Sequence, residues 1–153
     1  MKFVERIEVP VAVDEAWDFL WEVQRVARCL PGCVGVEEIE PGKTYKARFE
    51  DHVGPYKVSF DLNVVIDEAD PPRSLRLVAT GQDSRLGVSQ KVALLATLRA
   101  VDAAQTALEM DADVQVLGKI ATLGQFVIQR KAREVVKQFA ANVARELRYP
   151  AHV

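Results

Sequence analysis

Apolar and polar residues alternate along much of the chain, with the period of two that is typical of half-buried strands. Phe3, Ile7 and Val9 predict a first strand, and the same period returns after Val34. It is clearest at residues 56–66, where alternate side chains are apolar, which indicates one long strand with a single buried face. Further strands are predicted at residues 45–49, 75–81, 88–101 and 108–116, joined by connections short enough for antiparallel neighbours.

Two segments have helical spacing instead. The first begins at Asp14, the predicted N-cap, and extends to about residue 27 as two short helices or one bent helix. The second covers residues 119–148, lacks proline, and has an apolar face made of Ala121, Ile128, Ala132, Val135, Phe139 and Val143. We therefore predict one α+β domain over residues 1–153, with a curved antiparallel sheet of about seven strands and a long C-terminal helix packed across it.

Composition and charge exclude several classes of protein. With 49% hydrophobic and 27% charged residues, the chain has enough apolar side chains for an ordinary globular core. Its net charge of -2 gives no overall positive potential that would attract nucleic acid. Residues 119–148 hold seven basic and two acidic residues, and we interpret this stripe as a solvated helix face because no nucleic-acid motif accompanies it. The charged start of the chain is unlike a signal peptide, which predicts a cytoplasmic location.

No set of residues predicts catalysis or a metal centre. Cys29 and Cys33 lack the close spacing and co-ligands of zinc and redox motifs, so we expect both to be small structural side chains. The two histidines, His52 and His152, are isolated, and no nucleophile is paired with a base. We therefore predict no catalytic residue, no metal and no cofactor.

Four short motifs resemble a known family. They are Cys29-Leu30-Pro31-Gly32-Cys33, Val53-Gly54-Pro55, Asp70-Pro71-Pro72 and Gly118-Lys119-Ile120-Ala121-Thr122-Leu123-Gly124, with Phe139, Ala140 and Asn142 matching the late-helix pattern. In this order they resemble the CoxG family of carbon monoxide dehydrogenase accessory proteins, within the START-like (SRPBCC, Bet v 1-like) superfamily. The resemblance covers about residues 2 to 148 and implies the helix-grip fold, in which an apolar cavity lies between sheet and helix.

The resemblance also implies a biological setting. Members of this family are accessory proteins that serve membrane attachment or quinone supply for molybdenum hydroxylases. Many continue past the helix into a linker and an apolar membrane tail, whereas this sequence ends at Val153. We therefore do not extend the expectation of a permanent membrane anchor to this chain.

The expected cavity has candidate lining residues. One helix cannot fill the space beneath such long strands, although a fully packed core is the alternative. Gln90 shares the parity of the inward-facing set on its strand, so it either points inward, where a bound ligand's carbonyl is a possible partner, or faces solvent at the strand end. The lining candidates are Tyr45, Phe49, Tyr56, Phe60, Leu62, Leu77, Gln90, Met110, Phe139 and Val143.

A candidate docking site lies early in the long helix. Leu123, Phe126 and Val127 project away from the face that packs on the sheet, and cations flank them. Apolar side chains ringed by cations suit transient contact with an anionic bilayer surface or a partner protein, and packing against the sheet rim is the alternative. The flanking cations are Lys119, Arg130 and Lys131.

Three functions remain open at this point. The first is a carrier for a hydrophobic molecule, a quinone or a lipid, that delivers it to a membrane-associated redox system. The second is a small cyclase or dehydratase, which would need polar groups converging inside the cavity. The third is a docking adaptor whose core is filled.

Overall fold

The computed structural model describes residues 1–148, with the exception of the side chains of Lys119 and Ala121. His152 and the side chain of Lys119 therefore lie outside the described part. The elements, in chain order, are β1 (Lys2–Val9), α1 (Val13–Leu20), α2 (Val23–Cys29), β2 (Cys33–Glu40), β3 (Thr44–Val53), β4 (Tyr56–Asp70), β5 (Ser74–Asp83), β6 (Val88–Asp102), β7 (Gln105–Gly118), the 3-10 helix η1 (Lys119–Leu123) and α3 (Gln125–Arg148).

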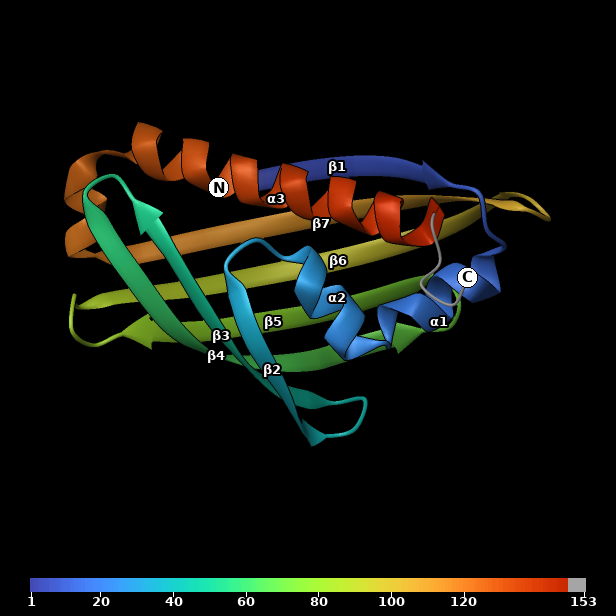
Figure 1. Cartoon of the computed structure of the whole chain (residues 1–153), viewed down its shortest axis with the longest axis horizontal. Coiled ribbons are helices and arrows are strands. Elements are labelled where there is room, and N and C mark those ends of the chain that lie inside the picture. Colours follow the sequence, from blue (N-terminus) through green and yellow to red (C-terminus); the bar gives the residue numbers. More distant parts are fainter. Residues whose placement is uncertain (149–153) are drawn as a thin grey trace.

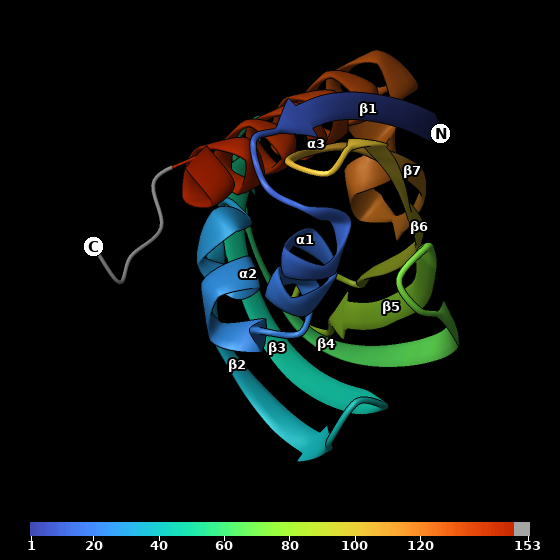
Figure 2. The ribbon, with the colours of Figure 1, turned by 90° about the vertical axis from the view of Figure 1, so that its right-hand side faces the viewer.

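The strands form one seven-stranded sheet in the order β1-β7-β6-β5-β4-β3-β2, and every neighbouring pair is antiparallel. The sheet curls strongly, and α3 lies along its concave side (Figures 1 and 2). The two short helices lie across the end of the curled sheet that faces the viewer in Figure 2. The predicted α+β helix-grip fold is confirmed, and the segment after Asp14 forms two short helices.

The alternation along each strand determines which side chains enter the core. On β4, Val58, Phe60 and Leu62 are buried while Asp61 between them is exposed. The apolar side chains that face α3 divide into two clusters. One contains Val9, Phe19, Leu108, Val143 and Leu147, and it packs the second half of α3 against β1, β6, β7, α1 and α2. The other contains Val58, Phe60, Leu62, Val88, Ile120 and Ile128, and it lies beneath the start of α3.

The short motifs have identifiable structural roles. Gly32 has a φ of +90°, and a Cβ there would come within 2.8 Å of the Phe49 ring, so only glycine fits the loop between α2 and β2. Asn142 of α3 donates a hydrogen bond of 2.8 Å to the carbonyl of Cys29, the last residue of α2. Because this carbonyl has no partner within its own helix, the bond holds α2 against α3.

Two local predictions were wrong. The long helix does not begin at residue 119, because Gly124 has a φ of +93° and separates η1 from α3. The first helix is not capped by Asp14, since its N-cap is Ala12 and Asp14 lies in the first turn. At that position the carboxylate still interacts favourably with the helix dipole.

Candidate ligand cavity

A cavity of about 320 Å³ lies between the sheet and the first half of α3. This volume is near the lower end of the roughly 300–1,000 Å³ that is usual for small-molecule sites. The inward faces of β3, β4, β5, β6 and β7 form its floor. From α3, the residues that line it are Ile128, Lys131, Ala132, Val135, Val136 and Phe139. The remaining wall comes from the end of α1, from α2 and the loops beside it, from β2 and from η1. These residues are Leu20, Trp21, Val23, Val26, Ala27, Leu30, Cys33, Val36 and Ile120.

Two of the predicted lining residues lie elsewhere. Val143 is 1% exposed and packs within the first core cluster, because α1 and α2 fill the space beneath the second half of α3. Tyr56, the first residue of β4, packs half-buried against the second cluster. The other eight lie on the cavity wall: Tyr45, Phe49, Phe60, Leu62, Leu77, Gln90, Met110 and Phe139.

The contribution of α2 to the wall was not predicted. Its apolar side chains, such as Val26 and Ala27, were expected to form a helix face, without any indication of what they would cover. Trp21 and Leu30, which flank α2, are also on the wall. The sequence placed Trp21 in a helical segment and Leu30 in the loop that ends it, but only the packing of α2 against β2 and α3 places both side chains over the cavity.

Few polar groups reach the cavity wall. The side-chain oxygen of Gln90 is buried and has no hydrogen-bond partner within the described residues. Lys131 is the one charged side chain among the described lining residues, and its Nζ lies 3.0 Å from Oδ2 of Asp51 on β3. The hydroxyl of Tyr45 accepts a hydrogen bond of 2.9 Å from the amide of Gly42. The described wall is therefore mostly apolar, and its polar groups are one amide, one hydroxyl, one thiol and one charge-neutralised lysine.

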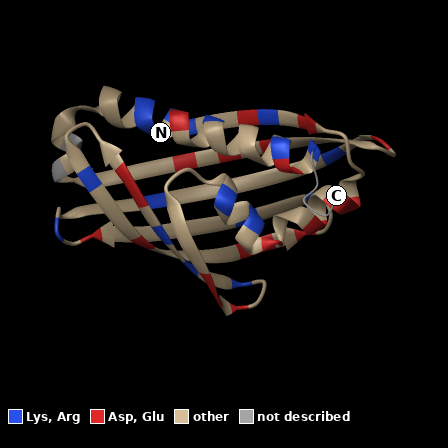
Figure 3. Cartoon of the chain, in the orientation of Figure 1, with Lys and Arg blue, Asp and Glu red and all other residues tan. Residues whose placement is uncertain are grey.

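The predicted docking residues divide between packing and exposure. Leu123 lies against the β3–β4 turn, since a Cβ built on Gly54 would be 3.2 Å from its Cδ1, and Val127 is half-buried. In contrast, Phe126 is 75% exposed, and the guanidinium of Arg130 lies 5.6 Å from its ring centroid. Lys131 is tied to Asp51. Figure 3 shows that Lys and Arg recur along α3, together with acidic residues, and Arg130 is the cation in contact with the exposed ring.

The two cysteines lie in different surroundings. Cys29 is 2% exposed, and burial raises the pKa of its thiol from 9.0 to about 11, with the Glu146 carboxylate acting in the same direction. Cys33 is half-buried on the cavity wall rather than in the core. Within the described residues, no group of three or more His, Cys, Asp and Glu side chains is arranged to hold a metal ion.

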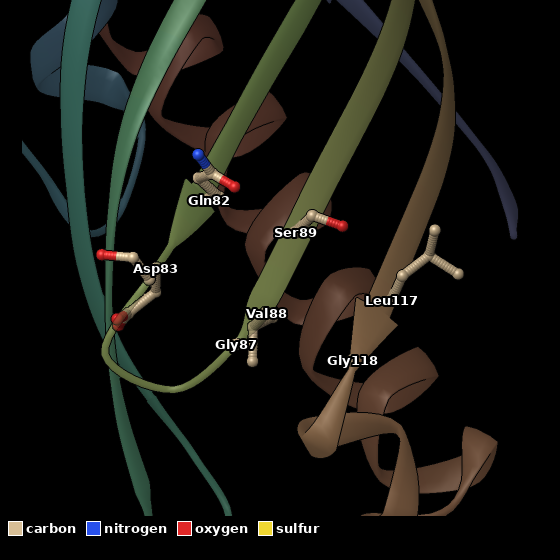
Figure 4. A pocket seen from close by; sticks show the side chains of 8 residues that line it. Gln82, Asp83, Gly87, Val88, Ser89, Leu117 and Gly118 are labelled. Atoms are coloured by element: carbon tan, nitrogen blue, oxygen red, sulfur yellow. The ribbon is translucent and has the colours of Figure 1, made fainter.

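A second hollow, of about 330 Å³, lies at the β5–β6 turn and the end of β7 (Figure 4). Its buried carboxylate, Asp83, accepts hydrogen bonds from the backbone amides of Ser59 at 2.9 Å and Leu86 at 3.2 Å. The bond from Ser59 is the main reason that the pKa of Asp83 is lowered below its ordinary value. Because these bonds close the β5–β6 turn and tie it to β4, we assign Asp83 a structural role.

A comparison of the sequence with known protein families identifies the family. The profile of the family described as the carbon monoxide dehydrogenase G subunit (CoxG) matches residues 6–148. The chain belongs to the CoxG family. Among curated proteins, none matches the sequence.

Solved structures show the same fold for this CoxG family member. A conserved protein from Geobacillus kaustophilus is similar with a TM-score of 0.83 and 22% identity, over 96% of this chain and 95% of that one. A START superfamily protein from Mycobacterium smegmatis has a TM-score of 0.72 and 11% identity, over 95% and 96%. The Zhui aromatase/cyclase from Streptomyces sp. R1128 has a TM-score of 0.65 and 16% identity, over 100% and 99%. At these identities the likeness establishes the START-like fold.

Proposed function

We propose that this protein is a carrier that binds a hydrophobic small molecule, a quinone or a lipid, in the cavity beneath α3. The observation that carries the proposal is the wall itself, which is apolar apart from a few groups and is large enough for one small molecule. Membership of the CoxG family and the START-like fold support the same role. An apolar ligand entering such a site gains roughly 25 cal/mol per Å² of apolar surface removed from water.

The proposed setting is the cytoplasmic face of a membrane, where the carrier would serve a molybdenum hydroxylase. The family description supports this partner. Within the described residues, no helix combines the length and hydrophobicity needed to cross a bilayer. We propose that contact with an anionic bilayer is transient and made through Phe126, with Arg130 beside it to attract the headgroups.

An enzyme of the cyclase or dehydratase kind receives less support. The structural likeness includes an aromatase/cyclase. However, general acid–base chemistry needs titratable groups directed at one reacting centre. On the described wall, the charged group is already paired with Asp51, and the remaining titratable groups are one hydroxyl, of Tyr45, and one thiol, of Cys33. A carrier needs no such titratable groups on its cavity wall.

The test uses Trp21, which lies on the wall and packs edge-on against Trp17 with ring centroids 5.9 Å apart. Quinones quench indole fluorescence, so titrating delipidated protein with a short-chain ubiquinone should give saturable quenching. Trp21→Phe should reduce the amplitude and leave the affinity within about twofold, since one aromatic ring replaces another. Native mass spectrometry of gently purified protein should also show lipophilic adducts. Unquenched fluorescence together with adduct-free protein would reject the carrier.

A further inference from the structure

Gln90 places an amide in an otherwise apolar wall. It lies near the start of β6, where its cross-strand neighbours are Gly81 on β5 and Val116 on β7. Neither neighbour has a polar side chain. The amide oxygen is buried and, among the described residues, has no hydrogen-bond donor. Of the alternatives that the sequence left open, the structure supports the inward-facing side chain.

An unpaired acceptor of this kind is costly. A buried polar group without a partner is destabilising relative to a satisfied one, whereas a methionine or leucine would line the same wall without that cost. A ligand that brings a donor to this oxygen would recover the loss. The partner expected from the sequence was a carbonyl, which the amide nitrogen can bind, but a carbonyl is itself an acceptor and leaves the amide oxygen unpaired. The complementary group is a hydroxyl or an N–H.

The charged groups around the cavity also restrict the charge that the ligand can carry. A carboxylate or phosphate taken out of water needs a cation to pair with. Lys131 is the one charged side chain on the described wall, and Asp51 already neutralises it at 3.0 Å. An anionic ligand would have to displace this aspartate or remain unpaired. A neutral headgroup needs neither.

We propose that Gln90 is the specificity-determining residue of the cavity, and that it selects a neutral apolar ligand whose hydroxyl donates to the Gln90 amide oxygen. Lipid alcohols, phenols and quinols belong to this class. The inference rests on the proposed carrier function and adds the headgroup to it. Within a quinone pair, the reduced form carries hydroxyl donors and the oxidised form does not, so the same residue would favour the quinol.

The experiment compares lauryl alcohol with lauryl methyl ether, which keeps the chain and the oxygen but lacks the donor. Their affinities for delipidated protein are measured by displacement of a fluorescent apolar probe from the cavity. We expect the ratio of alcohol to ether affinity to be roughly tenfold larger in wild type than in Gln90→Met, the worth of one well-made buried hydrogen bond. Gln115→Met is the matched control, because Gln115 is exposed on the neighbouring strand β7, and it should keep the wild-type ratio.

Each alternative outcome has one meaning. Equal ratios in wild type and Gln90→Met overturn the role of Gln90 and leave the carrier intact, whereas failure of wild type to bind either lauryl ligand or ubiquinone rejects the carrier itself. Laurate binding to wild type more tightly than lauryl alcohol overturns the neutral headgroup. Gln90→Leu is a second variant with the same expected ratio as Gln90→Met. Both variants should unfold at or above the wild-type temperature, since each removes an unpaired acceptor.

Discussion

Two buried alanines on the inner face of the sheet allow the cavity to be tested by filling it. Ala79 on β5 lies between Val64 and Val92, and all three residues line the cavity. Ala96 on β6 is similarly buried, with 6% of its surface exposed against 8% for Ala79, but it belongs to the first core cluster. A leucine at Ala79 would extend into open space, whereas a leucine at Ala96 would extend into packed side chains.

The two substitutions should therefore have opposite effects on the free energy of unfolding. Leucine adds about three buried carbons to alanine, a gain of at most roughly 2.4 kcal/mol at about 0.8 kcal/mol each. Fixing its rotamer costs about 0.5–1 kcal/mol. We expect Ala79→Leu to stabilise the ligand-free protein by about 1–2 kcal/mol, and Ala96→Leu to destabilise it by about 1–3 kcal/mol through overpacking.

Urea unfolding of delipidated protein measures both changes in the free energy of unfolding. In thermal unfolding, the midpoint temperature should shift by about 2–4 °C for each kcal/mol. The same Ala79→Leu variant should bind ubiquinone more weakly than wild type, because the leucine occupies the ligand's space. A loss of stability at Ala79 as large as that at Ala96 would refute the reasoning. The cavity would then be closed in solution, and the adaptor with a filled core would become the better hypothesis.

Three further predictions concern other parts of the molecule. Phe126→Ser should reduce sedimentation with anionic liposomes at low salt at least fivefold, because about 1.5–3 kcal/mol from burying the ring in the bilayer is lost. Equal pelleting of wild type and variant would exclude this ring as the contact. The thiol of Cys29 has a pKa of about 11 in the folded protein against 9.0 when unfolded, so between these pH values it ionises only in the unfolded chain and the free energy of unfolding should fall. Cys29→Ala should remove that part of the fall, and parallel curves of stability against pH for wild type and variant would contradict the prediction. Asn142→Leu should cost about 1–2 kcal/mol by leaving the Cys29 carbonyl unpaired, and unchanged urea unfolding would show that the bond is unimportant.

Much of this architecture could be predicted from the sequence, because a strand with one buried face has a simple period. The alternation at residues 56–66 placed Phe60 and Leu62 on the inner face, and both line the cavity. The motifs around Gly32 and Gly118 mark positions where positive φ and close backbone approach exclude a side chain, which is why they could be recognised without any structure.

What the sequence could not provide is how the helices share the space above the sheet. Val143 and Phe139 lie on the same apolar face of α3, yet only Phe139 reaches the cavity. The difference depends on where α1 and α2 lie, and helical periodicity contains no such information. The same limit applied to Asn142, whose partner is the end of a helix more than a hundred residues earlier in the chain.

The division of α3 into two halves explains how the domain can keep a cavity. At roughly 24 cal/mol per Å³, leaving 320 Å³ unfilled forgoes on the order of 8 kcal/mol, comparable with the whole 5–15 kcal/mol stability of a typical domain. The packed half, with Val143 and Leu147 against β1 and the short helices, must therefore supply much of the stability that the hollow half forgoes. A ligand at a hundred times its Kd returns about 2.7 kcal/mol to the folded state. The loaded carrier should consequently be the more stable form, and release should be easiest where something else, such as a bilayer beside Phe126, competes for the apolar surface.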